Sequence, residues 1–361
     1  MKTKPVKFLL MAITLLAAVF IASCSGDDDD GPVEGDKTEL VAAIAEIEDI
    51  LEDAEEGALE GQYQAGAKAT LQNAVNAAQD VVDDETATQA IVNSALANLM
   101  TALETFHGKV VEPIDVANLV GRWRFDEGSG STAGDDSDNG FDGTFEAGHA
   151  FWGAGSPTWT TDRHGDANKA IYFDDGANIE IPYNTALNPD KISISLWMKQ
   201  DVNTPNIVNN QYMIALNRWN GYKFNMQDVP KPFFTVNPQE NPGGHINRDA
   251  DKPDAGLPQG EWYHLVVTFG NGHMVFYVNG EETKDWEDFG DATVLDISAN
   301  PVNLTIGQDL PTSEYTLTNT AEDKFVEWGG HFIGAMDEIR IYKSVLTASQ
   351  VMSIYDAEKP D

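Results

Sequence analysis

The chain of 361 residues has little cysteine and few basic side chains. It contains one cysteine, Cys24, and 22 lysine and arginine residues against 59 aspartate and glutamate residues. A single cysteine excludes an internal disulfide bond, and a formal net charge of −37 repels nucleic-acid phosphates and anionic lipid headgroups. We therefore expect no nucleic-acid partner, and membrane attachment has to come from something other than surface charge.

The sequence also lacks the short motifs that mark many catalytic sites. It has no nucleophile elbow, no phosphate-binding P-loop, no zinc-ligand spacing and no dinucleotide-binding fingerprint. Its seven histidines are scattered, and His245, His264 and His273 form no ligand pattern. These absences favour a binding function over an enzymatic one.

The first residues have the pattern of an export signal. A lysine-rich start precedes an apolar run at residues 8–21, which is too short for a comfortable membrane span. The run leads into "IASC", which resembles the lipobox of bacterial lipoproteins. The resemblance implies a signal peptide over residues 1–23, cleavage before Cys24 and acylation of that cysteine, so that the lipid alone holds the protein to the membrane.

An acidic run, "SGDDDDGPVEGD", follows the cysteine. Its low hydrophobicity predicts that residues 24–36 form a disordered tether. Surface lipoproteins of Bacteroidetes-type bacteria often carry a similar run as an export signal, so the resemblance implies an outer-membrane protein exposed on the cell surface. The alternative is a plain solvated spacer.

Residues 37–108 have the apolar periodicity of three helices. The three stripes are Leu40, Ile44, Ile47 and Leu51; Leu71, Val75, Ala78 and Val82; and Ile91, Ala95, Leu99, Leu103 and Phe106. They predict an antiparallel bundle about 30 Å long. The segment resembles a FIVAR-type repeat, a helical module of bacterial cell-surface proteins. It has no cluster of His, Cys or aromatic residues, so we interpret it as a stalk, with weak protein or sugar binding as the alternative.

A short linker, residues 109–118, leads into β-rich runs separated by Gly, Asn, Asp and Pro. Ile192, Ile194 and Leu196 alternate with polar residues, and Asn279-Gly280 indicates a hairpin turn. Many short strands separated by turns predict an all-β antiparallel sandwich.

Several of these runs occur in a recognisable order: "LVGRWRFDEGSGSTAGDDSDNGFDGTF", "ISISLWMK", "LPQGEWYHLVVTFGNGHMVFYVNGEE" and "FIGAMDEIRIYKSVLTASQVMSIY". Together they resemble the laminin-G-like jelly roll of the concanavalin A-like lectins and glucanases, over residues 119–357. The expected chain is therefore multidomain, with a small three-helix bundle followed by an all-β antiparallel jelly-roll sandwich. A proline-rich insertion at residues 227–258 departs from the family pattern, and it either shapes the rim of a binding cleft or is a passive surface insertion.

The run "RWRFDEGSG" ends a strand-like alternation on two acids and a glycine turn. In the family that it resembles, the two ends of the domain pair near a structural calcium site. The resemblance, carried over by position, implies a calcium ion bound by Asp126, Asp337 and the backbone carbonyl of Gly176. Calcium takes about six to eight oxygen ligands, including carbonyls. The alternative is that the two aspartates only cap strand ends.

Catalytic acids are not evident. Retaining glycosidases need two carboxyl groups about 5–5.5 Å apart, and the glucanases of this fold carry them two residues apart on one strand. Asp337 and Glu338 are adjacent and would face opposite ways along a strand, whereas the acids of "DWEDF" follow a hairpin turn. We expect no catalytic residues, and a divergent glycoside hydrolase remains an alternative.

Two aromatic segments are candidates for a sugar platform. "LNRWNGYKF" combines Arg218, Trp219, Asn220 and Tyr222, and "FVEWGGHF" contains Trp328. An aromatic plane can cover the C–H face of a sugar ring while polar side chains bind its hydroxyls. We take these as candidate carbohydrate-binding residues; the alternative is that they pack long loops against the sandwich.

The combined prediction is a non-catalytic lipoprotein that captures a polysaccharide at the cell surface for an uptake or degradation system. A glycan importer of the outer membrane is the expected partner. The acidic balance favours a neutral glycan, such as a β-glucan, over a sulfated or uronic one. An adhesive or structural surface protein that binds another protein is the remaining alternative.

Overall fold

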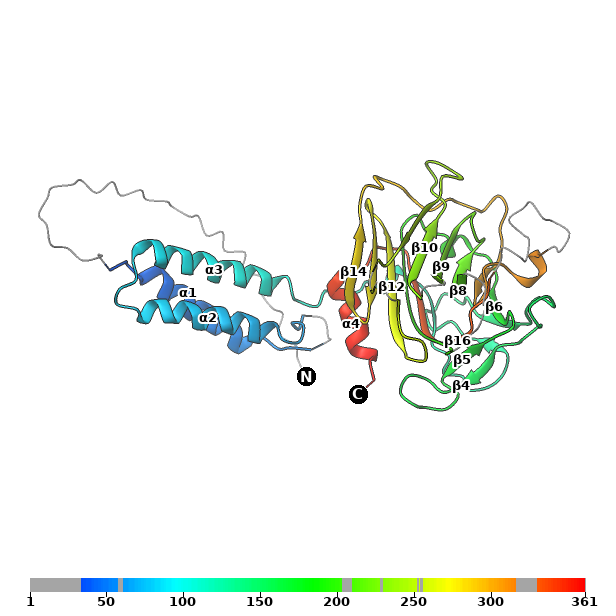
Figure 1. The fold of residues 1–361 in the computed structure, drawn as a ribbon, viewed down its shortest axis with the longest axis horizontal. Coiled ribbons are helices and arrows are strands. Elements are labelled where there is room, and N and C mark those ends of the chain that lie inside the picture. Colours follow the sequence, from blue (N-terminus) through cyan, green and yellow to red (C-terminus); the bar gives the residue numbers. More distant parts are fainter. Residues whose placement is uncertain are drawn as a thin grey trace, which may run out of the picture.

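The computed structural model describes residues 34–57, 61–202, 210–227, 230–251, 253, 256–315 and 330–360. These residues form a helical module and a two-layered β-sandwich, and the C-terminal helix α4 (Ala348–Glu358) lies on the side of the sandwich nearest the module (Figure 1). The expected signal peptide, Cys24 and Trp328 lie outside the described residues. Within the described ranges, no helix combines the length and apolarity needed to cross a membrane.

Three helices form the helical module, as predicted: α1 (Thr38–Asp53), α2 (Ala67–Asp83) and α3 (Gln89–His107). Each contributes one apolar stripe to a shared core, and Tyr63, between α1 and α2, stacks on Phe106 with ring centroids 4.0 Å apart. The third stripe differs from the prediction. Ile91 is 45% exposed, whereas Val92 is 3% exposed and lies in the core with Leu99 and Phe106. The buried positions of α3 thus repeat every seven residues, or two helical turns.

The sandwich consists of two antiparallel sheets, which confirms the predicted all-β architecture. The strands of the first sheet are β1 (Leu119–Trp123), β4 (Thr158–Thr160), β5 (Ala170–Phe173), β7 (Ile192–Gln200), β12 (Tyr263–Gly270), β13 (His273–Val278), β14 (Glu281–Trp286) and β16 (Gly334–Tyr342). The strands of the second sheet are β2 (Thr132–Ala133), β3 (Gly143–Glu146), β6 (Asn178–Ile181), β8 (Asn210–Leu216), β9 (Tyr222–Gln227), β10 (Pro232–Val236), β11 (Ile246–Asp249) and β15 (Leu304–Ile306). The first sheet has the order β14-β13-β12-β7-β16-β5-β4, with β1 also paired to β16, and the second has the order β11-β10-β9-β8-β15-β6-β3-β2.

The apolar core lies between the two sheets. The predicted alternation along β7 is confirmed, because Ile192, Ile194 and Leu196 are fully buried in the core. The opposite face of β7 is also buried. The helix α4 packs on that outer face of the first sheet through Val351 and Ile354, in a small cluster with residues of β12, β13 and β16. The helix therefore covers one outer face of the sandwich.

The proline-rich insertion is not one irregular loop. Residues 227–258 include β10 and β11, which extend the second sheet beyond β9. Phe234 and Val236 alternate into the core, so this part of the insertion is an integral layer of the sandwich. The insertion thereby widens the outer face of the second sheet.

Candidate functional site

The outer face of the second sheet is polar but buried at its centre. Along β9, Phe224 and Met226 face the core, so Lys223 and Asn225 face outward. In register beside them lie Thr235 on β10 and Tyr212 on β8. These four outward side chains are each at most 1% exposed. We call Tyr212, Lys223, Asn225 and Thr235, together with Arg218 from the β8–β9 turn, the polar face.

Several polar atoms of this face lack the partners that burial normally requires. The atoms are Nη1 and Nη2 of Arg218, Oδ1 of Asn225 and Oγ1 of Thr235, for which the described residues provide no hydrogen bond. A buried polar group without a partner costs about 1–3 kcal/mol, and native proteins leave few of them. The polar face is therefore an enclosed network whose hydrogen bonds the described residues satisfy only in part.

The turn between β8 and β9 places Arg218 on this face. Asn217 and Arg218 both adopt left-handed backbone conformations, with φ of 57° and 48°, which are uncommon for residues other than glycine. The Nε of Arg218 donates to the carboxylate of Asp309, which also accepts from the hydroxyl of Tyr315 and, at 3.2 Å, from the amide of Gly330. The carboxylate thus fixes the guanidinium by one edge. Backbone strain held in place by such a network is typical of functional sites.

Lys223 is enclosed by aromatic rings. Its Nζ lies 3.3 Å from the centroid of the Trp219 ring and 5.0 Å from that of Tyr212, and it donates to the Tyr212 hydroxyl at 3.2 Å. Among the described residues, no carboxylate lies within ion-pair distance of this ammonium. Burial lowers the pKa of Lys223 to about 7, and the charge of Arg218 contributes, while Asp309 opposes the shift. Within the described part of the chain, the amino group of Lys223 is thus buried without a directly paired carboxylate.

Trp219 forms the rim of the polar face. Its side chain is half-buried, and its ring centroid is 5.4 Å from that of His245, which lies in the insertion. The insertion thus contacts the rim of the polar face through His245, and β10 contributes Thr235 to the face itself.

The sequence-predicted carbohydrate-binding residues have different positions. Arg218 and Trp219 meet at the polar face, and Asn220 is half-buried in the same turn, where its backbone amide donates to the carbonyl of Asn217 at 2.8 Å. The expectation for Tyr222 is corrected, because this side chain is fully buried in the core and its hydroxyl donates to the carbonyl of Leu187. Trp328 lies outside the described residues.

Sequence reasoning missed the polar residues of the strands. In "YKFNM", Lys223 and Asn225 alternate with three apolar residues, so the pattern already indicated a polar outer face. Asp309, in contrast, is 91 residues from Arg218 along the chain. No local pattern signals this pair.

The implied calcium ligands do not share a site. The strands β1 and β16 that lead to Asp126 and Asp337 are paired, as the resemblance implied. However, the Asp126 carboxylate binds Arg124 at 2.9 Å and Lys169 at 3.0 Å, and the Asp337 carboxylate binds Arg163.

Lys169 precedes β5 and Gly176 follows it, so the two residues lie at opposite ends of this strand. The carbonyl of Gly176 accepts a hydrogen bond from the side-chain amide of Asn178 at 3.1 Å. Burial raises the pKa of Asp337 to about 8, with Glu338 and Asp162 adding to the shift and Arg163 opposing it. Carboxylates already neutralised by separate cations do not fit one calcium ion, which needs several converging oxygens.

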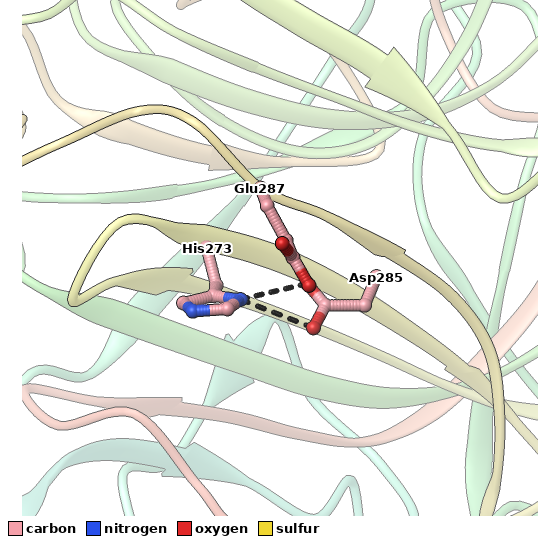
Figure 2. A group of neighbouring side chains, drawn as sticks. All are labelled: His273, Asp285 and Glu287. Atoms are coloured by element: carbon pink, nitrogen blue, oxygen red, sulfur yellow. Dashed lines mark hydrogen bonds and ion pairs between the residues drawn. The ribbon is translucent and has the colours of Figure 1, made fainter.

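One group of side chains in the described part of the chain has the spacing of metal ligands. His273, at the start of β13, meets Asp285 of β14 and Glu287 just beyond it, with one ligand atom of each within 4.8 Å of the others (Figure 2). The Nδ1 of His273 lies 3.0 Å from both carboxylate oxygens of Asp285, and this hydrogen bond raises the pKa of His273. The nitrogen donor suits a transition metal better than calcium. The strand pairing brings the three together, which their sequence positions did not reveal.

A buried serine–histidine pair lies on the other side of the sandwich. Ser195 Oγ and His264 Nε2 are 2.8 Å apart, but the His264 ring is fully buried and near those of Trp197 and Tyr355. Burial lowers the pKa of His264 to about 3, with the positive charges of Arg340 and Arg163 contributing, so the imidazole is neutral. Its Nδ1 has no hydrogen-bond partner among the described residues. An enclosed pair without an orienting carboxylate does not form a catalytic triad.

Comparison with known proteins assigns families to both parts of the chain. The family model described as concanavalin A-like lectin/glucanases superfamily matches residues 173–352, and the FIVAR domain model matches residues 36–107. A gellan lyase from Bacillus sp. is 39% identical over 90 residues, which span 24% of this chain and 4% of the lyase.

Two solved structures resemble the chain at low identity. Domain 4 of a GH43 extracellular arabinanase from Geobacillus stearothermophilus, in complex with arabinotriose, is 20% identical, with a TM-score of 0.47 over 66% of this chain and 98% of that domain. The binding domain of Paraclostridial Mosquitocidal Protein 1 is 16% identical, with a TM-score of 0.47 over 67% of this chain and 52% of the other.

Proposed function

This chain belongs to the concanavalin A-like lectin/glucanases superfamily through its β-sandwich, and from this premise we propose that it captures a polysaccharide without cleaving it. The observation that carries the proposal is the polar face. Its buried donors and acceptors lack protein partners among the described residues, and the half-buried Trp219 ring lies beside them. The apolar face of a sugar ring would stack on the accessible part of the indole, and the enclosed polar network behind the indole would hold it in place.

Among its described residues, the polar face lacks the pair of carboxyl groups that a glycosidase uses, which supports binding without hydrolysis. The described residues of the polar face include one carboxylate, that of Asp309, which is fully buried and engaged by Arg218, Tyr315 and the amide of Gly330. A glycosidase needs a second carboxyl group at a defined distance. Because Asp309 has no such partner among the described residues of the polar face, it is better suited to holding Arg218 than to acid–base chemistry.

The remaining architecture supports display at a cell surface. In this proposal the lipid on Cys24 anchors the chain, residues 24–36 act as a tether and the FIVAR domain acts as a stalk that carries the sandwich outward. The captured glycan would then pass to an outer-membrane importer or to a degrading enzyme. The partial identity to a protein named for its action on gellan is consistent with a polysaccharide partner.

Affinity electrophoresis through gels that contain single polysaccharides tests this proposal. Retarded migration with at least one polymer, without release of reducing sugars, is the expected result. Trp219→Ala should abolish the retardation, whereas Trp262→Ala, a half-buried tryptophan beside Lys199 outside the polar face, should retain it.

Two outcomes would overturn the proposal. Release of reducing sugars would establish an enzyme. Unretarded migration through every polymer would instead favour an adhesive protein that binds another protein.

A further inference from the structure

We propose that His273, Asp285 and Glu287 bind a divalent transition-metal ion of the zinc class at the edge of the first sheet. The polar face belongs to the second sheet, so this inference does not depend on the proposed function. One imidazole nitrogen and two carboxylates are a ligand set that zinc accepts, with bonds of about 2.0–2.2 Å.

The pairing of β13 with β14 turns the three side chains to the same side of the sheet. Val275 is directly opposite Asp285 in this register. Continued by two residues, the register sets His273 opposite Glu287, and residues two apart along a strand share a face. Val275 belongs to the small cluster under α4, so this is the outer face of the first sheet. Side chains that are directly or diagonally opposite on one face can reach each other.

The backbone on both sides of Glu287 is held against β13. Trp286 pairs with Met274, and the amide of Phe289 donates to the carbonyl of Gly272 at 3.1 Å. Groups carried by paired strands are positioned more precisely than groups on loops. Figure 2 shows the imidazole and both carboxylates gathered at one place on this hairpin. A metal ion would therefore need to reorient only the ends of side chains.

The two carboxylates have little positive charge beside them. Among the described residues, no lysine or arginine lies within ion-pair distance of Asp285 or Glu287, and Asp285 pairs with His273 instead. The group differs in this respect from Asp126 and Asp337, whose carboxylates bind separate cations. With a neutral imidazole, the form that binds metals, the three ligands carry two negative charges, which one divalent ion balances.

The ligands are accessible from the solvent. The side chain of His273 is 43% exposed and that of Asp285 is 31% exposed, and Glu287 is exposed as well. Three protein ligands leave the fourth tetrahedral position of zinc to water or to an external group. The ion would join β13 to the chain just beyond β14, the edge strand, in a protein whose single cysteine allows no internal disulfide.

Isothermal titration of the full chain with ZnCl₂ tests the site. The protein carries no histidine tag and is freed of metal with EDTA, which is then removed by dialysis. We expect saturable binding of Zn²⁺ that excess CaCl₂ does not inhibit, because calcium prefers a set of oxygen ligands. Titration with CoCl₂ gives a second readout, since the visible absorption of bound Co²⁺ reports its directly coordinated ligands.

Variants locate the ion. His273→Gln, Asp285→Asn and Glu287→Gln should each weaken Zn²⁺ binding at least about tenfold, because even the loss of a group that orients a metal ligand costs about 10–100-fold. Two matched controls should keep the wild-type affinity. They are His107→Gln, at an exposed histidine of the helical module, and Glu281→Gln, at an exposed acid of β14.

Three results would overturn the proposal. Zn²⁺ binding that all three substitutions leave unchanged would place the ion elsewhere on the chain. The absence of saturable Zn²⁺ binding would show that the group is a surface hydrogen bond beside a free carboxylate. Calcium binding as tight as zinc binding would contradict the assignment to a transition metal.

Discussion

The ammonium nitrogen of Lys223 lies 3.3 Å from the centroid of the Trp219 ring. The two residues belong to one hairpin, and the left-handed conformations of Asn217 and Arg218 shape the turn that leads to the indole. Because Trp219 and Tyr212 cover the lysine, the amino group is shielded from water and the pKa of Lys223 falls to about 7. This environment has a measurable consequence for stability.

Lys223 should make the free energy of unfolding depend on pH between about 7 and 9. In the unfolded chain a lysine keeps its ordinary pKa of about 10.4, so the unfolded state binds more protons than the folded state in this range. Stability should therefore rise with pH, by up to about 1.4 kcal/mol per pH unit. Below about pH 7 both states are protonated and the contribution is constant. Urea unfolding at several pH values measures this slope.

The comparison with Lys223→Met isolates the contribution of this lysine. The substitution should remove the slope, whereas Lys199→Met should leave it unchanged. A Lys223→Met protein with the pH dependence of the wild type would show that Lys223 is charged and solvated in the folded state.

Arg163→Met should be strongly destabilising. The Asp337 carboxylate is 2% exposed and ion-paired with Arg163, whose Nε also donates to the carbonyl of Glu358 at 2.7 Å. Above about pH 8, where the Asp337 carboxyl is ionised, removing Arg163 leaves a buried charge uncompensated and costs about 3–5 kcal/mol. The double variant Arg163→Met/Asp337→Asn should be less destabilised than Arg163→Met alone. Urea unfolding of the set forms a double-mutant cycle, and additive effects would contradict the coupling.

Calcium should not stabilise the sandwich through Asp126 and Asp337. Each carboxylate already has a cationic side chain as its partner, so we expect the same Tm in excess CaCl₂, in MgCl₂ of equal ionic strength and in EDTA. A ligand that binds only the folded state at about a hundred times its Kd stabilises by about 2.7 kcal/mol. A calcium-specific rise of Tm that is lost in Asp337→Asn would restore the calcium site that the sequence resemblance implied.

His273 should titrate above the ordinary histidine pKa of about 6.5. Its hydrogen bond to Asp285 favours the imidazolium, with a further contribution from Glu287. This stabilising contribution is present below the ordinary pKa and is lost as pH rises through the raised value. The side chain is 43% exposed, so the effect belongs in an NMR titration rather than in unfolding data. Asp285→Asn should lower the titration midpoint, and Glu281→Gln on the same strand should not. An unchanged midpoint in Asp285→Asn would exclude the pair in solution.

Local sequence pattern determined most of the architecture. A period of 3.6 residues predicted the three helices and alternation predicted β7, because side-chain direction within a helix or strand follows from backbone geometry alone. The Asn-Gly dipeptide predicted the hairpin turn at Asn279-Gly280. The errors came where the pattern was ambiguous. Ile91 and Val92 are both apolar, and only packing against α1 and α2 decided which of them entered the core.

Tertiary structure decided the candidate site. The sequence singled out the segment of Arg218 and Trp219, but it assigned Tyr222 to the surface and overlooked its neighbour Lys223. The side chains of Tyr222 and Lys223 point to opposite faces of β9, and only the packing decides which face meets the core. Asp309 and the strand β10 come from distant parts of the chain. The amino-acid sequence by itself thus determined the helices, the strands and the family, since these follow from short-range geometry and the order of motifs. The register between strands and the folding of the β8–β9 turn decided which charges are buried together, because electrostatic partners are set by distance in space and not by distance along the chain.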